Sequence, residues 1–177
     1  LAHLIEHGSR GLNAAVNVWD RLNGQYHERR LNDAEIAGLR RLYGDSIDYG
    51  AVRIRYGGTL VGRARTDAFV IDNTIWFDQT MIDANGNFNE RGLNLLNHEM
   101  CHVWQYQNHG PTVMGNALLA QWTMGSHVDN GRNQGLGNAY DWFTPASTGK
   151  GFEDMNPEQQ AELAEYPSLL PTPRKSV

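Results

Sequence analysis

Cysteine is almost absent from this chain of 177 residues, which contains only Cys101. A single cysteine excludes an internal disulfide framework, so the fold does not depend on oxidising conditions. We expect the Cys101 thiol to be a small packed group, because buried thiols are mostly inert.

Long apolar runs and an ordinary export signal are also missing. No segment approaches the ~18 apolar residues of a membrane span, so we expect none. The N-terminus, Leu-Ala-His-Leu-Ile-Glu-His, carries acid and histidine where a signal peptide has basic residues and an apolar core. The chain also begins without methionine, as a domain of a longer protein would.

Basic residues are few and scattered. The net charge is −5, and no basic run is longer than Arg29 with Arg30 or Arg40 with Arg41. This pattern argues against a nucleic-acid partner, and we expect both pairs to be solvated charges on helices. At 177 residues and 40% hydrophobic, the chain can bury one good core, so a single domain over residues 1–177 is expected.

The most informative feature present is the run His-Glu-Met-Cys-His at residues 98–102. On a helix, His98 and His102 lie on one face, so their imidazoles can converge on one tetrahedral ion. Glu99 is then placed to deprotonate a water on that ion. The alternative is a pair of histidines satisfied by backbone carbonyls, and redox control by Cys101 is the alternative to its packing role.

The residues around this motif have the period of a helix. A buried stripe is expected, widened on one side by two further apolar residues, and the histidines lie beside it. Its members are Leu93, Leu96, Met100 and Val103, with Leu95 and Trp104 beside them.

A hydrolytic zinc site keeps three protein ligands, so a third must come from elsewhere. The metzincin pattern fails because His109 comes too soon and Gly110 follows it. Residues 156–166 predict a second helix with an N-cap, a proline at its first position and a capping box. As third ligand we rank Glu158 of this helix first and Glu162, one turn later, second. A second acid at that spacing could also orient a histidine by accepting its other N–H. Glu153 and Asp141, which precede the helix, rank last. For Glu158, a first-turn acid facing the helix dipole is the alternative.

Three runs together resemble a known family. Residues 96–106, 137–142 and 152–162 look like the zinc metallopeptidase domains found as effector or C-terminal extension domains of Vgr-type spike proteins of type VI secretion. Residues 31–55 are similar to the helix, glycine turn and strand that precede the motif there. The resemblance covers about residues 31–166.

The resemblance implies a zinc cofactor, with His98, His102 and Glu158 as ligands and Glu99 as the catalytic base. It further implies an antibacterial effector toxin that hydrolyses peptide bonds in a protein or peptide substrate. Such a domain would leave the cell without a signal peptide, on a spike or another secretion-machine carrier. It would act in the periplasm of a target bacterium, and an immunity protein would be a further partner.

The expected fold is α+β: a mainly helical, zincin-like domain with a small antiparallel or mixed sheet packed on the motif helix. We expect an N-terminal helical region within residues 1–30, a capped helix over 33–43 ending at Gly44, and a proline-punctuated tail over 167–177. Strands are predicted at residues 52–56, 68–71 and 74–77, the last two around a turn at 72–73.

Two further features have a functional interpretation and a plainer one. Residues 74–77 are a candidate edge strand for an extended substrate, or else Trp76 and Phe77 pack the core from either face. In the glycine- and asparagine-rich stretch 123–155, Tyr140 is a candidate donor to the oxyanion of the reaction, with His127 as an alternative. The plainer interpretation of Tyr140 is a half-buried aromatic residue with a satisfied hydroxyl.

Two rival functions stay open. The first keeps the zinc but makes the substrate the cell wall, as in a peptidoglycan amidase or endopeptidase. The second is a non-catalytic module in which zinc stabilises the fold or the site binds partners. An intact Glu99 argues against the second, because a structural zinc site needs no base beside an open coordination position.

Overall fold

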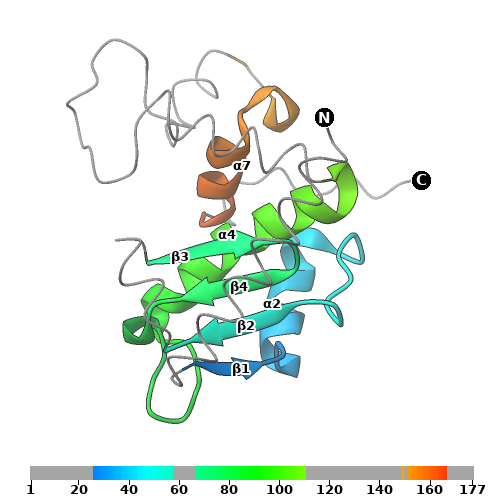
Figure 1. Ribbon diagram of the computed structural model, residues 1–177. Coiled ribbons are helices and arrows are strands. Elements are labelled where there is room, and N and C mark those ends of the chain that lie inside the picture. The colour runs from blue at the N-terminus through cyan, green and yellow to red at the C-terminus, as the bar shows by residue number, and fades with distance from the viewer. Residues whose placement is uncertain (1–25, 58–66, 111–148, 150, 167–177) are drawn as a thin grey trace, which may run out of the picture.

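The computed structural model describes residues 26–57, 67–110, 149 and 151–166 (Figure 1). Three α-helices and a four-stranded sheet account for most of this part of the chain. The expected α+β fold is therefore confirmed. The expected helix within residues 4–22 and the tail over 167–177 lie outside the described residues.

The sheet is mixed, and its strand order is β1-β2-β4-β3. Its strands are β1 (His27–Arg29), β2 (Arg53–Tyr56), β3 (Ala68–Ile71) and β4 (Thr74–Phe77). Strand β2 pairs antiparallel with β1 and parallel with β4, and β3 pairs antiparallel with β4. The hairpin between β3 and β4 turns at Asp72, which has a φ of 55°. Both strands have the bounds that the sequence predicted.

Strand β4 lies inside the sheet, where β2 and β3 pair with it on its two sides. The prediction that residues 74–77 form an edge strand open to substrate is therefore wrong. The plainer interpretation is confirmed, because Trp76 and Phe77 are both buried. Phe77 packs in the main core, whereas Trp76 packs with Phe69 and Ile71 in a separate cluster.

Residues 27–29 form a strand, so the expected helical region over 1–30 is wrong at this end. Pairing to β2 and two ion pairs hold this short segment extended. The Glu28 carboxylate lies 2.6 Å from the Arg55 guanidinium, and both terminal nitrogens of Arg29 donate to the Glu35 carboxylate at 2.8 Å. Arg29 thereby connects β1 to helix α2 (Asp33–Tyr43).

The helices begin where the capping residues predict. Helix α2 (Asp33–Tyr43) has a capping box between Asn32 and Glu35 and ends before Gly44, whose φ is 57°. Helix α4 (Glu90–His109) contains the motif and is capped by Asn89. Helix α7 (Pro157–Ala164) follows, and the short 3-10 helices η1 (Gln79–Met81) and η2 (Phe152–Asp154) precede α4 and α7. None of the helices in the described part of the chain has both the length and the apolar character needed to cross a membrane.

Helices α2 and α4 cover the same face of the sheet (Figure 1). The core between these layers contains the predicted stripe residues Leu96, Met100 and Val103, each at most 2% exposed. Leu93 is the exception, because it is 45% exposed and lines a hollow of about 530 Å³ between α2 and α4. The helical period places a residue on one face of the helix, but it does not say whether a neighbouring element covers that residue.

The start of α4 lies very close to the segment before it. A Cβ atom added at the buried Gly92 would lie 2.5 Å from the Met81 carbonyl oxygen and 2.9 Å from the Phe88 ring. Neither the backbone at Met81 nor the helix can move without disturbing the core. We therefore expect Gly92→Ala to lower the free energy of unfolding by about 1–3 kcal/mol, as overpacking does.

The matched control is Gly38→Ala on the exposed side of α2, where no atom of the described residues lies within 4 Å of the added Cβ. That change should raise the free energy of unfolding by about 0.5–1 kcal/mol, because alanine is the better helix former. Urea unfolding of the two variants measures both effects. Equal midpoints would contradict the close packing at Gly92.

Candidate metal centre

Helix α4 presents two different stripes along its length. Leu96, Met100 and Val103 face the sheet, whereas His98 and His102 face helix α7, and each histidine is 6% exposed. The spacing of four residues places the two imidazoles one turn apart, with ring centroids separated by 5.1 Å. The helix therefore holds both rings in a buried position on one side.

Helix α7 delivers the carboxylate. Asn156 caps it, Pro157 occupies its first turn and Gln159 completes a capping box, all as predicted. The helix lies close to α4 because small residues meet at their contact, namely Ala161, Ala164 and Cys101. Small side chains let two helices approach closely, so a residue in the first turn of α7 can reach the histidines.

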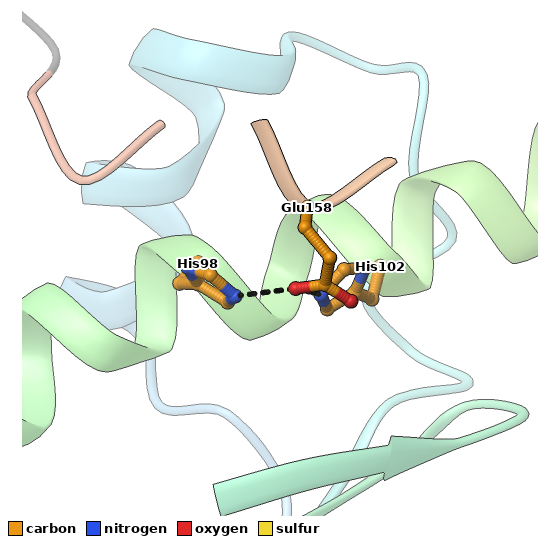
Figure 2. Close-up of side chains that lie close together, drawn as sticks. All are labelled: His98, His102 and Glu158. Carbon is orange, nitrogen blue, oxygen red and sulfur yellow. Dashed lines mark ion pairs between the residues drawn. The ribbon is translucent and has the colours of Figure 1, made fainter. Parts of the chain in front are cut away.

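That residue is Glu158, which is only 1% exposed. Its Oε2 atom lies 3.6 Å from Nε2 of His98 and 3.4 Å from Nε2 of His102. Figure 2 shows its side chain descending from α7 toward the two rings on α4. The three donor atoms all lie within 4.8 Å of one another.

These separations fit one tetrahedral zinc ion. Ligand atoms that lie 2.0–2.2 Å from zinc at tetrahedral angles are separated by about 3.4 Å. The two nitrogen-to-oxygen distances, 3.4 and 3.6 Å, agree with this value. Two imidazoles and one carboxylate are also a donor set that zinc hydrolases use, with a fourth position left for water.

The other nitrogen of each ring has its own partner, which orients the ring. Nδ1 of His102 lies 2.9 Å from Oε1 of Gln105. Nδ1 of His98 lies 3.1 Å from Oε1 of Glu165 and 3.7 Å from Oε2 of Glu162. Gln105 therefore holds Nδ1 of His102, two carboxylates lie beside Nδ1 of His98, and Nε2 of each ring faces Glu158.

Burial and charge act in opposite directions on these groups. Burial alone lowers the pKa of His98, but its contacts with Glu158 and Glu165 raise it to about 10. Burial also lowers the pKa of His102, and the negative charge of Glu158 reverses that shift. The pKa of Glu158 is raised by burial but held well below its usual range by the two histidines. The carboxylates around the two histidines thus favour their protonated forms when no metal is bound, and zinc binding would release protons.

Glu99 lies beside this cluster and is 5% exposed. Burial raises the pKa of its carboxyl, and the positive charges of His98 and His102 offset only part of that shift. A raised pKa makes a carboxylate a better proton acceptor near neutral pH. Its surroundings therefore suit a general base.

The chain is 30% identical over 156 residues to the type VI secretion system spike protein VgrG2b of Pseudomonas aeruginosa. The matched region covers 85% of this chain and 14% of that protein. The chain is related to a segment of a VgrG spike protein. No family model matches the chain, and no solved structure matches it.

In this VgrG-related chain, the structure brings together His98, Glu99, His102 and Glu158 as the sequence suggested. It also distinguishes between Glu158 and Glu162, the two candidates for the third ligand. Glu158 faces the Nε2 side of both rings, whereas Glu162 faces the Nδ1 side of His98. Two groups of side chains in the described residues could hold a metal ion: His98 with His102 and Glu158, and His98 with Glu162 and Glu165. Glu153 is exposed in η2 and belongs to neither of them.

Three other candidates, Asp141, Tyr140 and His127, lie outside the described residues, so their roles stay predictions. Cys101 is fully buried against α7, and burial raises the pKa of its thiol well above the usual range. The expectation of a packed cysteine is confirmed.

Two residues of the site were missed. Glu165 is the closer carboxylate to His98, although Glu162 was expected to orient a histidine. The spacing of Glu158, Glu162 and Glu165 by four and then three residues places all three on one face of α7, and this signal was available. Gln105 follows His102 by three residues, which is also a same-face spacing.

Proposed function

We propose that this chain is a zinc-dependent metallopeptidase that acts as an antibacterial effector of type VI secretion. The observation that carries the enzymatic part is the convergence of two Nε2 atoms and one carboxylate oxygen at tetrahedral ligand separations. A buried carboxylate with a raised pKa lies next to them. The relation to a VgrG spike protein supports the secretion part.

In the proposed reaction, His98, His102 and Glu158 would hold the zinc. Zinc, when bound, would supply Lewis acidity that lowers the pKa of a water and polarises the scissile carbonyl. Glu99 would take one proton from the attacking water while the water oxygen bonds to the carbonyl carbon. As the carbon–nitrogen bond breaks, Glu99 would pass that proton to the leaving amine, so the carboxylate is regenerated.

The residues that contact Nδ1 of the two histidines would orient the rings in the proposed site. Gln105 would keep the Nδ1 proton of His102 in place, and the charge of Glu165 beside Nδ1 of His98 would favour a proton on that nitrogen, so that both Nε2 atoms face the metal. Tyr140 stays the candidate donor to the developing oxyanion. The carrier would be a spike or a VgrG-type fusion, the substrate a protein or peptide, and an immunity protein a further partner.

The biological part can be tested by growth. A test bacterium would produce the domain with or without an added periplasmic export signal, as wild type, as Glu99→Ala and as Glu90→Ala. Glu90 is an exposed glutamate on the same helix and serves as the matched control. We expect arrest only with export, lost in Glu99→Ala and kept in Glu90→Ala.

Each other outcome removes a defined part of the proposal. If Glu99→Ala arrests growth as wild type does at equal protein level, the domain acts by binding and not by hydrolysis. If the wild type is harmless in both compartments, the antibacterial part is wrong. Release of soluble fragments from purified cell wall, with no cleavage of an unfolded protein, would favour the peptidoglycan-directed alternative.

A further inference from the structure

Gln105 is a polar residue at the centre of the contact between α4 and α7, and it is only 1% exposed. Its amide makes three hydrogen bonds. Oε1 accepts from Nδ1 of His102 at 2.9 Å, and Nε2 donates to the Pro157 carbonyl at 3.1 Å and to Oε1 of Gln160 at 2.8 Å. A buried amide satisfied on both ends is specific about what surrounds it.

The orientation of this amide follows from its partners. The Pro157 carbonyl can only accept a hydrogen bond, so the NH₂ end of Gln105 must face it. The oxygen end must then face His102, and because an oxygen cannot donate, Nδ1 of His102 must carry the proton. In the neutral imidazole that metal binding requires, this fixes the tautomer of His102, with the lone pair on Nε2.

The side-chain amide of Gln160 is oriented by its own partners as well. Nε2 of Gln160 donates to the Phe152 carbonyl at 3.0 Å, so the oxygen of Gln160 faces Gln105. The hydrogen bonds therefore all run in one direction, from His102 through Gln105 and Gln160 to a backbone carbonyl before α7. Hydrogen bonds aligned in this way polarise and strengthen one another.

Gln105 also acts on the second ligand. Pro157 is the residue directly before Glu158, so the bond from Gln105 to its carbonyl fixes the first turn of α7 against α4. One side chain thus orients His102 on its own helix and holds the backbone next to Glu158 on the other helix.

We propose that Gln105 is the positioning residue of this metal centre, which sets the tautomer of His102 and fixes Glu158 through the Pro157 carbonyl. The inference rests on the proposed zinc site. It goes beyond that site in predicting that zinc affinity depends on a residue that does not touch the metal. It also predicts that the dependence passes through both helices.

The test is zinc affinity measured by competition with a chromophoric chelator, for wild type, Gln105→Met and Gln107→Met. Methionine is close in shape to glutamine but cannot accept from His102 or donate to Pro157. Gln107 lies two residues later on α4, and its amide contacts Asp48 and Asn73 away from the metal centre. We expect Gln105→Met to weaken zinc binding by about 10–100-fold, the range for outer contacts of metal ligands, and Gln107→Met to leave it unchanged.

A second readout separates positioning from mere packing. In ¹H–¹⁵N spectra of the zinc-loaded wild type, the Nδ1 proton of His102 should be observed and protected from solvent exchange. In zinc-loaded Gln105→Met that resonance should be lost or exchange rapidly. If Gln105→Met does not fold, Gln160→Met keeps the His102 contact but removes one acceptor, and it should weaken zinc binding to a smaller extent.

The outcomes distinguish the two proposals. A wild type that does not bind zinc overturns both. A wild type that binds zinc, with Gln105→Met binding equally tightly or with an unchanged Nδ1 proton, overturns the role of Gln105 alone. If Gln105→Met does not fold, zinc affinity in Gln160→Met equal to that of wild type likewise overturns it.

Discussion

Replacing Glu99 with glutamine is expected to lower the rate of peptide hydrolysis by about 10²–10⁴-fold, the usual contribution of a general base, while zinc stays bound. The amide has nearly the same shape as the carboxylate but cannot accept the water proton. The proposed zinc ligands His98, His102 and Glu158 are unchanged, so metal content should match that of wild type. The measurement is cleavage of an unfolded protein at equal, independently determined zinc content.

The matched control for this change is Glu90→Gln, an exposed glutamate in the first turn of the same helix. It should retain full activity and full zinc content. Cleavage by Glu99→Gln at the wild-type rate would remove Glu99 from the chemistry and would favour a base elsewhere. Loss of zinc in Glu99→Gln would instead assign this carboxylate to metal binding.

Glu158→Gln is expected to have the largest effect on the metal itself. An amide oxygen is a weak zinc ligand compared with a carboxylate, so zinc affinity should fall by more than the ~100-fold upper range seen for outer contacts. Zinc should then no longer raise the midpoint of thermal unfolding at concentrations that stabilise wild type, because ligand-linked stability depends on affinity. Thermal unfolding with and without zinc measures this directly.

Glu162→Gln is the matched comparison, because Glu162 lies one turn later on α7 and faces only the Nδ1 side of His98. Its zinc affinity should fall by no more than about 10-fold, the lower range for outer contacts. If zinc affinity falls more in Glu162→Gln than in Glu158→Gln, Glu162 is the third ligand, and Glu158 only forms ion pairs with the histidines.

Local signals predicted the helices and the hairpin. The capping boxes of Asn32 and Asn156 involve residues three apart, so the starts of α2 and α7 can be inferred without knowing the rest of the fold. The turn around Asp72 likewise defined β3 and β4. In each case the interaction that fixes the element lies within a few residues of it.

Non-local pairing is what the sequence did not predict. The inner position of β4 depends on its parallel pairing with β2, from which it is separated by more than fifteen residues. The strand at 27–29 is only three residues long and is held by its pairing with β2 and by Glu28, whose partner Arg55 lies 27 residues away. Leu93 has the helical spacing of a core residue, but it lines a hollow between α2 and α4, so its exposure depends on how these two helices pack.

The candidate site divides in the same way. His98, Glu99 and His102 follow from spacing within one helical turn. The preference for Glu158 over Glu162 depends on how α7 is placed against α4, and that placement depends on Ala161, Ala164 and Cys101 meeting at the contact. Gln105 and Glu165 have same-face spacings, but their partners become visible only once the two helices are docked.

The two stripes of α4 separate the residues that maintain the fold from those that would carry out the proposed reaction. Substitutions along the histidine stripe leave Leu96, Met100 and Val103 packed against the sheet. A related chain could therefore lack the residues of the proposed reaction and still have the same fold. A shared outline among distant relatives is therefore no sign of shared catalysis. Whether a given relative is an enzyme is better judged from four positions, those equivalent to His98, Glu99, His102 and Glu158.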